Sequence, residues 1–537
     1  MGLSPSAEPL TQKSVQARGE AASNLDARPA SVIVPHPRNA PVNILMASSE
    51  ATPFAKTGGL ADVCGALPGE LARLGHHVTL MIPAYRHVYQ SGQPIEATDI
   101  NLDIPIGAKV VTGHLLRSRL PDSDVPVYLV QQDDYFDRPE LYREAGADYK
   151  DNCERFVFFC RSVMESVRLL QLRPDVLHAH DWQCGLIPAY LEIEYGIAPG
   201  FENAVSVLTI HNLAYQGQFW HWDMLLTGLD WKYFNWRQME YYGDLNLLKT
   251  GIVFADAINT VSPRYAEEIQ RAPLGCGMEN VLTHRRDVLS GILNGVDYRH
   301  WNPATDPHLA MRFGPHDWPA GKAACKAALQ RDLGLAVSRD TPLIGFVGRL
   351  AEQKGCDLIA RMLEQRAAVA EMQWVFLGRG ELEYQERFSQ LAQQHPDRIA
   401  VRLDFDDRLA HQIEAGADMF LMPSRYEPCG LNQMYSLKYG TVPIVRETGG
   451  LADTIVDATA ENIAAGTANG FTFLEYDAAT LERTVTRACD TFRQRPEAWQ
   501  QLVSAGMQQD WSWSRSARRY AELFAQAAAR AKQPVSA

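Results

Sequence analysis

The chain has 537 residues, of which 46% are hydrophobic and 21% charged, and its formal net charge is −13. This length is too great for one hydrophobic core, so we expect two large domains with tails. The negative charge argues against a broad nucleic-acid surface, and no apolar run reaches the roughly 18 residues that a membrane-spanning helix needs.

The nine cysteines are scattered, and none of them forms a CxxC pair. This pattern favours free thiols in a reducing compartment, and hence a cytoplasmic protein, over a disulfide framework or a zinc site. Residues 1–40 are rich in Pro, Ser and Ala and lack the apolar segment of a secretory signal. We therefore expect a mobile leader there and a short tail at 533–537.

Strand-like apolar runs alternate with helical patterns from Val42 onward. The helix that follows the first strand has an apolar face made of Val63, Leu67, Leu71 and Leu74, and Gly75 is a plausible stop. Strands are predicted over residues 42–46, 77–82, 127–130, 176–178, 205–210 and 257–261. This βαβ alternation indicates a mostly parallel sheet with helices on both faces.

A second series of the same kind begins at Pro342, with strands predicted over residues 342–347, 374–377, 399–403, 419–422 and 442–445. The predicted fold class is therefore α/β, with two doubly wound domains. We place these domains at residues 41–288 and 289–505. A last helix within 506–532, over residues 513–530 with Ser512 as its N-cap, is expected to pack back on the first domain.

A two-glycine turn, Lys56-Thr57-Gly58-Gly59-Leu60-Ala61-Asp62, lies between the first strand and the first helix. Glycines let the backbone approach a ligand closely, and a helix N-terminus offers unpaired N–H groups to an anion. An ordinary tight turn would have the same sequence. The turn is not the GxGxxG fingerprint, so a nicotinamide or flavin site is not supported.

Polar residues also end the strands that follow. His178, His180 and Asp181 close one strand, and Trp182 is a candidate for further contacts. No third metal ligand is apparent beside the two histidines, so a polar lining of the cleft is favoured over a metal site. His211 follows the next strand and could hydrogen-bond a sugar, although a satisfied loop histidine would look the same.

The second domain carries its charges in the same positions. Arg349 and Lys354 follow its first strand, where two fixed cations suit a diphosphate. Glu427 stands in Ser424-Arg425-Tyr426-Glu427-Pro428-Cys429-Gly430-Leu431, directly after a buried strand. A carboxylate there could hold sugar hydroxyls, act as a base or cap the next helix. Thr448-Gly449-Gly450 supplies a second glycine turn for phosphates.

Taken together, these motifs closely resemble the bacterial glycogen synthase and plant starch synthase family of retaining glucosyltransferases. The resemblance covers residues 42–530, with six motifs in the family's order and spacing. It implies that the two doubly wound domains are Rossmann-like and face a central cleft, as in the GT-B type of fold. Tyr426 stands where phenylalanine is more usual, and Cys64 where an aliphatic residue is more usual. Neither departure changes the set of charged residues.

The resemblance implies a role for each matching residue. The catalytic set would be His211, Arg349, Lys354 and Glu427. The residues that contact the donor nucleotide-sugar would be Lys56, Gly58, Gly59, Asn294, Gly430, Leu431, Thr448, Gly449 and Gly450. Asp62 would lie in the cleft near the donor or the acceptor, and Asp181 would help line the acceptor side, with the donor held mainly by the second domain.

The implied reaction moves glucose from ADP-glucose to the non-reducing end of an α-1,4-glucan such as glycogen, with retention of configuration. We expect the acceptor to attack from the face of the leaving group, with Glu427 binding hydroxyls rather than attacking carbon. No metal or other cofactor is expected, because the two cations can stand in for magnesium. The alternatives are a retaining enzyme of the same fold that uses UDP-glucose, and a non-catalytic glucan-binding protein.

Overall fold

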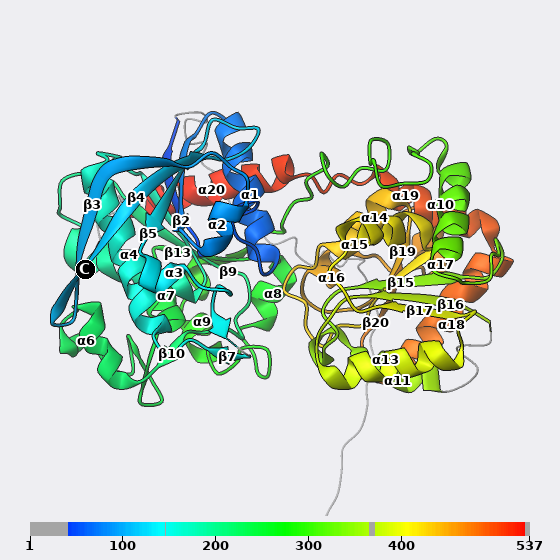
Figure 1. Cartoon of the computed structure of the whole chain (residues 1–537). Helices are drawn as coiled ribbons and strands as arrows, with labels where there is room; N and C mark the ends of the chain where they lie inside the picture. The colour runs from blue at the N-terminus through cyan, green and yellow to red at the C-terminus, as the bar shows by residue number, and fades with distance from the viewer. Residues whose placement is uncertain (1–40, 145, 365–370, 532–537) are drawn as a thin grey trace, which may run out of the picture. The chain divides into compact units, whose positions relative to one another are not determined.

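The computed structural model describes residues 41–144, 146–364 and 371–531, so the predicted leader and the tail at 533–537 lie outside the described residues. Two large sheets dominate the fold, and helices flank both of them (Figure 1). Within the described residues, no helix combines the length and the apolar character needed to cross a membrane.

The first sheet has nine strands in the order β14-β13-β9-β8-β1-β2-β5-β4-β3. Their bounds are β1 Asn43–Ala47, β2 His77–Pro83, β3 Glu96–Ile106, β4 Lys109–Arg119, β5 Pro126–Gln131, β8 Val176–His180, β9 Val205–Ile210, β13 Ala257–Thr260 and β14 Leu289–Gly291. The pairs from β14 to β5 are parallel, whereas β4 and β3 extend one edge as an antiparallel hairpin. The sequence analysis did not predict this hairpin.

The helices of the first sheet are α1 Gly59–Arg73, α2 Arg86–Gln90, α3 Asp133–Phe136, α4 Asn152–Leu169, α5 Leu186–Tyr190, α6 Met224–Thr227, α7 Leu247–Phe254, α8 Pro263–Glu268 and α9 Glu279–His284. Small antiparallel sheets join β6 Arg143–Glu144 to β7 Ala147–Asp148, and β10 Gln218–Phe219 and β11 Glu240–Tyr241 to β12 Asp244–Asn246. As predicted, Val63, Leu67 and Leu71 are buried on α1, while Leu74 caps its C-terminus and is partly exposed.

The second sheet has six parallel strands in the order β17-β16-β15-β18-β19-β20. These are β15 Leu343–Val347, β16 Gln373–Leu377, β17 Ile399–Arg402, β18 Met419–Met422, β19 Val442–Arg446 and β20 Phe471–Phe473. Its helices are α10 Trp318–Asp332, α11 Cys356–Glu364, α13 Leu382–Gln394, α14 Asp407–Gly416, α15 Asn432–Tyr439, α16 Gly449–Thr454, α17 Ala460–Ala464, α18 Ala478–Gln494 and α19 Pro496–Gln508. Numbered within the sheet, this is the 3-2-1-4-5-6 order of a Rossmann fold.

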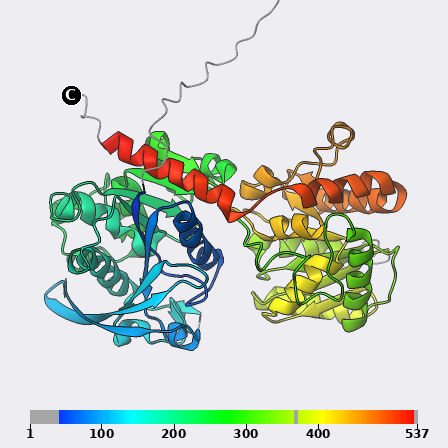
Figure 2. The same cartoon turned by 90° about the horizontal axis from the view of Figure 1, so that it is seen from above.

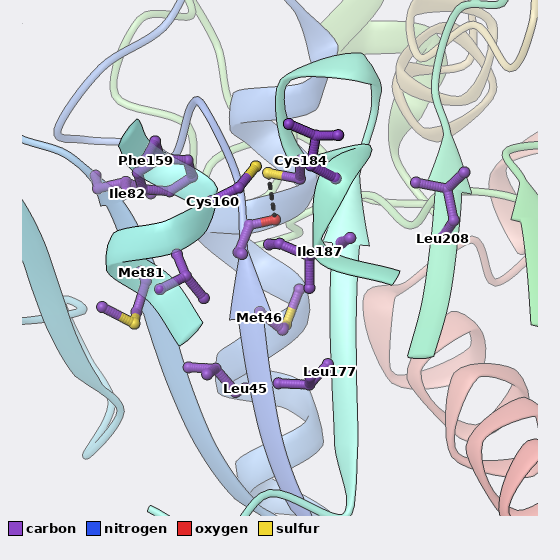
Figure 3. Close-up of a cluster of buried hydrophobic side chains, with 14 of the residues drawn as sticks. Leu45, Met46, Met81, Ile82, Phe159, Cys160, Leu177, Cys184, Ile187 and Leu208 are labelled. Carbon is purple, nitrogen blue, oxygen red and sulfur yellow. Dashed lines mark hydrogen bonds between the residues drawn. The ribbon is translucent and has the colours of Figure 1, made fainter. Parts of the chain in front are cut away.

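The predicted α/β class with two Rossmann-like sheets is therefore confirmed. Central strands such as β8 and β18 are buried at every position, because helices cover both faces of a parallel sheet. Figure 3 shows part of the first core, where Leu45 and Met46 of β1 lie in one cluster with Met81 and Leu177 from the neighbouring strands. The Cys184 thiol donates a hydrogen bond to a β1 carbonyl at 3.2 Å in the same cluster.

The last helix, α20 Trp513–Ala531, belongs to the core of the first sheet. It packs beside α1 and over β9 (Figures 1 and 2). Tyr520 accepts a hydrogen bond from the Asn259 amide at 3.0 Å, and the rings of Tyr520 and Phe524 lie 5.6 Å and 5.3 Å from the His178 ring. The C-terminus of the chain thus completes the part of the fold with which the described N-terminus begins.

Candidate functional site

The predicted site residues gather at the carboxyl ends of strands beside the point where each sheet reverses its strand order. In the first sheet that point lies between β1 and β8, and in the second between β15 and β18. Ligands of open α/β sheets bind outside these switch points. The loops after β1, β8 and β9, and those after β15, β18 and β19, carry nearly all of the predicted residues.

The first glycine turn is open on its outer side. A Cβ atom added to Gly58 or Gly59 would meet no heavy atom within 4 Å. Gly58 is extended, with φ −159°, so its backbone conformation does not demand glycine. Neither packing nor strain therefore explains the pair, and both observations agree with a surface that a ligand approaches closely.

Lys56 and Asp62 form an ion pair across this turn, with Lys56 Nζ 2.7 Å from Asp62 Oδ1. Burial raises the pKa of the Asp62 carboxyl, and the charge of Lys56 opposes that shift. Both side chains are partly exposed, so the pair can be rearranged by a charged ligand. The structure thus brings Lys56, which is predicted to contact the donor, together with Asp62, which is predicted near the donor or the acceptor.

Glu50 holds the same turn in place, and the sequence analysis missed it. Its side chain is only 3% exposed, and its carboxylate accepts hydrogen bonds from the backbone N–H groups of Thr57 and Gly58. The hydroxyls of Thr57 and Tyr142 donate to it at 2.6 Å and 2.7 Å. The only signal in the sequence is a carboxylate three residues after a buried strand.

The resemblance implies that this turn contacts a nucleotide-sugar, and on that basis we expect the Glu50→Gln variant to raise the KM for that donor about tenfold or more. The amide keeps the size of the side chain but presents an NH₂ group to donors, and each charge-assisted hydrogen bond lost from a buried site costs about 1.5–3 kcal/mol. Steady-state kinetics with varied donor and fixed glucan measures the effect. Tyr142→Phe removes a single donor and serves as a milder control. An unchanged donor KM in Glu50→Gln would contradict this role.

Three histidines form a column in which His178 and His180 are buried and His211 is partly exposed. The rings of His178 and His180 lie 4.1 Å apart, and His180 Nδ1 lies 2.9 Å from His211 Nε2. His178 Nε2 bonds the Thr209 hydroxyl at 2.7 Å. Burial lowers the pKa of His178 and His211 to about 3, so both rings are neutral at physiological pH. No cluster of three or more potential metal ligands occurs within the residues described.

The neutral state of His178 predicts a pH dependence of stability. Its pKa is about 3 when folded and about 6.5 when unfolded, so its contribution is complete above about pH 6.5 and is lost as the pH falls toward 3. In His178→Gln the amide can still donate to Thr209 but does not titrate. Between about pH 6 and pH 4, wild type should lose about 1.4 kcal/mol per pH unit more than the variant. Urea unfolding at several pH values tests this, and parallel curves would refute it.

Asp181 organises the loop that carries His211. Its Oδ1 accepts the His211 backbone N–H at 2.7 Å, and burial raises its pKa to about 7. Its φ of +55° is unusual for a residue other than glycine, and such strain is often found at functional sites. Trp182, which we had suggested as a further contact residue, is instead buried against Phe156 and the Gly217 backbone.

In the second sheet, Lys354 and Glu427 form an ion pair, with Lys354 Nζ 2.6 Å from Glu427 Oε2. The Glu427 side chain is 6% exposed and also accepts the Ser424 hydroxyl at 3.0 Å. These two donors hold the buried carboxylate in a fixed position. The structure therefore joins the predicted diphosphate contact directly to the predicted glucose contact.

Arg349 lies near the same pair but keeps a different partner. Its guanidinium donates to the Gln353 amide oxygen at 2.5 Å and lies 3.4 Å from the Tyr215 hydroxyl. Tyr215 comes from the loop after β9 of the first sheet, which also carries His211. Neither partner is charged, and Arg349 forms no ion pair within the described part of the chain, although the more distant Glu381 acts on its charge.

Asn294 has an unused acceptor. Its side chain is 6% exposed, and its Oδ1 is buried without a hydrogen-bond partner among the described residues. Buried polar atoms are nearly always paired, so an unpaired one at a predicted site suggests a ligand hydroxyl or a water. Gly430 has φ +72°, which requires glycine, and Leu431 directly precedes α15.

The second glycine turn differs from the first because packing explains it. A Cβ on Gly449 would lie 1.9 Å from the Glu427 carbonyl oxygen, and one on Gly450 would lie 2.0 Å from that of Cys429. The Thr448 hydroxyl and the Gly449 N–H both donate to Glu268 Oε2, at 3.1 Å and 3.0 Å. A phosphate bound to these two donors would have to displace Glu268. Its role as a phosphate site stays a prediction.

Known proteins share this sequence and this fold. Residues 43–284 match the family model for the starch synthase catalytic domain, and residues 334–500 match the model for group 1 glycosyl transferases. The glycogen synthase of Rhodopirellula baltica is 46% identical over 494 residues, which cover 90% of this chain and 97% of the relative. That of Anaeromyxobacter dehalogenans is 48% identical over 487 residues, which cover 90% and 99%.

Solved structures agree with these relatives. The catalytic domain of starch synthase IV from Arabidopsis thaliana, solved with ADP and acarbose bound, is 31% identical. It superposes with a TM-score of 0.83 and covers 91% of this chain and 100% of its own. Sucrose-phosphate synthase from Thermosynechococcus elongatus, 17% identical with a TM-score of 0.54, shares the fold alone. The chain belongs to the glycogen synthase and starch synthase family and is a glycosyltransferase.

Proposed function

We propose that this enzyme transfers glucose from ADP-glucose to the non-reducing end of an α-1,4-glucan, with retention of configuration. The observation that carries the proposal is the buried Lys354–Glu427 pair at the switch point of the second sheet. It joins a cation suited to a diphosphate to a carboxylate suited to sugar hydroxyls. The ADP bound to the plant relative of known structure supports the choice of nucleotide.

The proposed roles follow from these contacts. Arg349 and Lys354 neutralise the diphosphate as it leaves, which is usually the largest contribution to such catalysis. Glu427 and Asn294 bind glucose hydroxyls, and His211 contacts the same sugar. The turn with Lys56, Gly58 and Gly59 approaches the donor, as do the backbones of Gly430 and Leu431 and the turn from Thr448 to Gly450. Asp62 and Asp181 lie toward the glucan.

Retention follows if the acceptor hydroxyl attacks from the face of the departing diphosphate. In that route the C1–O bond to the diphosphate breaks as the bond to the glucan oxygen forms, and a phosphate oxygen takes the proton of the acceptor. Glu427 need not attack, because Arg349 and Lys354 supply the stabilisation of the leaving group. Exclusion of water protects the activated glucose from hydrolysis.

The proposed organisation assigns residues 41–288 to the acceptor side and residues 289–505 to the donor. We place the enzyme in the cytoplasm, with glucan and nucleotide-sugar as its partners. Support comes from the nine cysteines, all free and eight of them buried, which suit a reducing compartment. The net charge of −13 is unfavourable for a nucleic-acid partner.

Elongation of glycogen with ADP-glucose and UDP-glucose in parallel tests the proposal, with release of nucleoside diphosphate as the readout. We expect strong release from ADP-glucose that depends on glycogen. Release from UDP-glucose alone would keep the site but reassign the donor. Release from neither would refute the proposed reaction and favour a glucan-binding protein that does not catalyse transfer.

A further inference from the structure

The roles proposed above leave His180 without a function. It ends β8, its side chain is 0% exposed, and its Nδ1 lies 2.9 Å from His211 Nε2. Its other ring nitrogen, Nε2, is buried and has no hydrogen-bond partner among the described residues. Because the contact joins two imidazole nitrogens, one of them must donate and the other must accept.

The buried Nε2 atom decides which nitrogen donates. Burial lowers the pKa of both rings, so each is neutral and carries a single N–H. If His180 carried its proton on Nε2, a buried N–H would have no acceptor. If it carries the proton on Nδ1, only a lone pair stays unpaired, which is the less costly arrangement. His180 therefore donates and His211 Nε2 accepts.

We propose that His180 is a positioning residue that fixes His211 in the tautomer protonated on Nδ1. His211 Nδ1 has no partner among the described residues and is not among the buried unpaired atoms, so it reaches open space. The enzyme then presents a fixed N–H donor at this position. On the proposed function, on which this inference rests, that donor meets a hydroxyl oxygen of the transferred glucose and cannot serve there as a general base.

The neighbouring groups support this arrangement. The His178 ring lies 4.1 Å from that of His180 and is tilted by 41° to it. Its own Nδ1 is buried without a partner among the described residues, and its Nε2 contacts the Thr209 hydroxyl. By the same reasoning its proton lies on Nε2. The His211 backbone is fixed by Asp181, so the ring has a defined position as well as a defined tautomer. The contacts of His180 and Asp181 thus orient the His211 Nδ1–H group.

Three variants of His180 test what His211 Nε2 needs as its neighbour: a hydrogen-bond donor, an acceptor, or no hydrogen-bonding group. In His180→Asn the amide nitrogen can take the place of Nδ1 and donate, so we expect kcat within about threefold of wild type. His180→Asp puts an acceptor at the same position and requires His211 to donate from Nε2, and His180→Leu removes the contact. We expect both to lower kcat at least tenfold, with binding of ADP unchanged.

Nitrogen-15 NMR of histidine-labelled wild type supplies a readout that needs no variant. We expect the His211 signals, assigned with a His211→Gln sample, to show a protonated Nδ1 and an unprotonated Nε2. A proton on Nε2, or an Asp variant as active as the Asn variant, would overturn the proposal. Failure of the wild type to transfer glucose from either nucleotide-sugar would refute the proposed function instead, while the NMR result would still report the tautomer.

Discussion

Replacing Lys354 with alanine should lower kcat/KM for the nucleotide-sugar about 10³-fold, or about 4 kcal/mol. The substitution removes a cation that the proposed reaction uses on the departing diphosphate. Among the residues that the structure describes, it also leaves the Ser424 hydroxyl as the one donor to the buried Glu427 carboxylate. Initial rates of nucleoside diphosphate release, measured at several donor concentrations with saturating glucan, give the effect on kcat and on KM separately.

A matched control removes a positive charge elsewhere. Arg493 on α18 pairs with the exposed Glu371 at 2.8 Å, and such surface pairs contribute about 0–1 kcal/mol to stability. Arg493→Ala should therefore leave activity and thermal stability nearly unchanged. Arg349→Ala should lower kcat/KM by a similar factor, because both cations are proposed to act on the departing diphosphate. The Arg349 guanidinium forms no ion pair in the described structure, so its loss leaves no carboxylate unpaired. Unchanged turnover in both the Lys354 and Arg349 variants would refute the assignment to the diphosphate.

Replacing Glu427 with glutamine should lower kcat by about 10²–10³-fold, the range found when one preorganised electrostatic contact is lost at an active site. The amide removes the charge that holds Lys354 at 2.6 Å and weakens the contact to sugar hydroxyls. The loss should appear mainly in kcat, because these contacts strengthen as charge develops on the sugar and the diphosphate. Single-turnover measurements with ADP-glucose and a short maltooligosaccharide test the expectation.

The same residue separates the two routes to retention. If Glu427 only binds hydroxyls, wild-type enzyme incubated with donor in the absence of acceptor should show no covalent glucose in the intact-mass spectrum. A retaining enzyme with a carboxylate nucleophile forms a glycosyl-enzyme intermediate. A glucosyl adduct mapped to Glu427 would therefore establish the double-displacement route and rule out direct attack on the face of the leaving group.

Buried parallel strands were the part of the fold most readily predicted from sequence. β18 has the predicted bounds, β2 and β15 differ from theirs by one residue at one end, and β1 is shifted by one residue. The reason is physical, since a strand covered on both faces must be apolar throughout and therefore appears as an uninterrupted run. The final helix was predicted within one residue because its apolar face repeats with helical spacing.

The hairpin of β3 and β4 was missed for the converse reason. In β3, buried residues alternate with exposed ones, so Leu102, Ile104 and Ile106 are separated by polar residues or proline. A half-exposed antiparallel strand has a period of two, and a search for apolar runs passes over it. Gly107, with φ +57° in the connecting turn, was the available signal.

The candidate site was likewise predicted only in part. Motifs in the sequence named the charged residues, but they did not show which of them pair. The link between Lys354 and Glu427 spans 73 positions, and the contact of Glu268 with Thr448 spans 180, so neither leaves a local pattern. Glu50 and His180 act through the backbone or ring of another residue. Their importance depends on three-dimensional contacts rather than on spacing along the chain.

The place of α20 has a consequence for how the protein is made. Its Tyr520 and Phe524 cover His178 of the first sheet, yet they lie near the end of the chain. On the ribosome, the N-terminal domain of most proteins can finish folding before the next one is synthesised. Here the residues of the second sheet are translated before those of α20. The face of the histidine column therefore stays uncovered until α20 has left the ribosome.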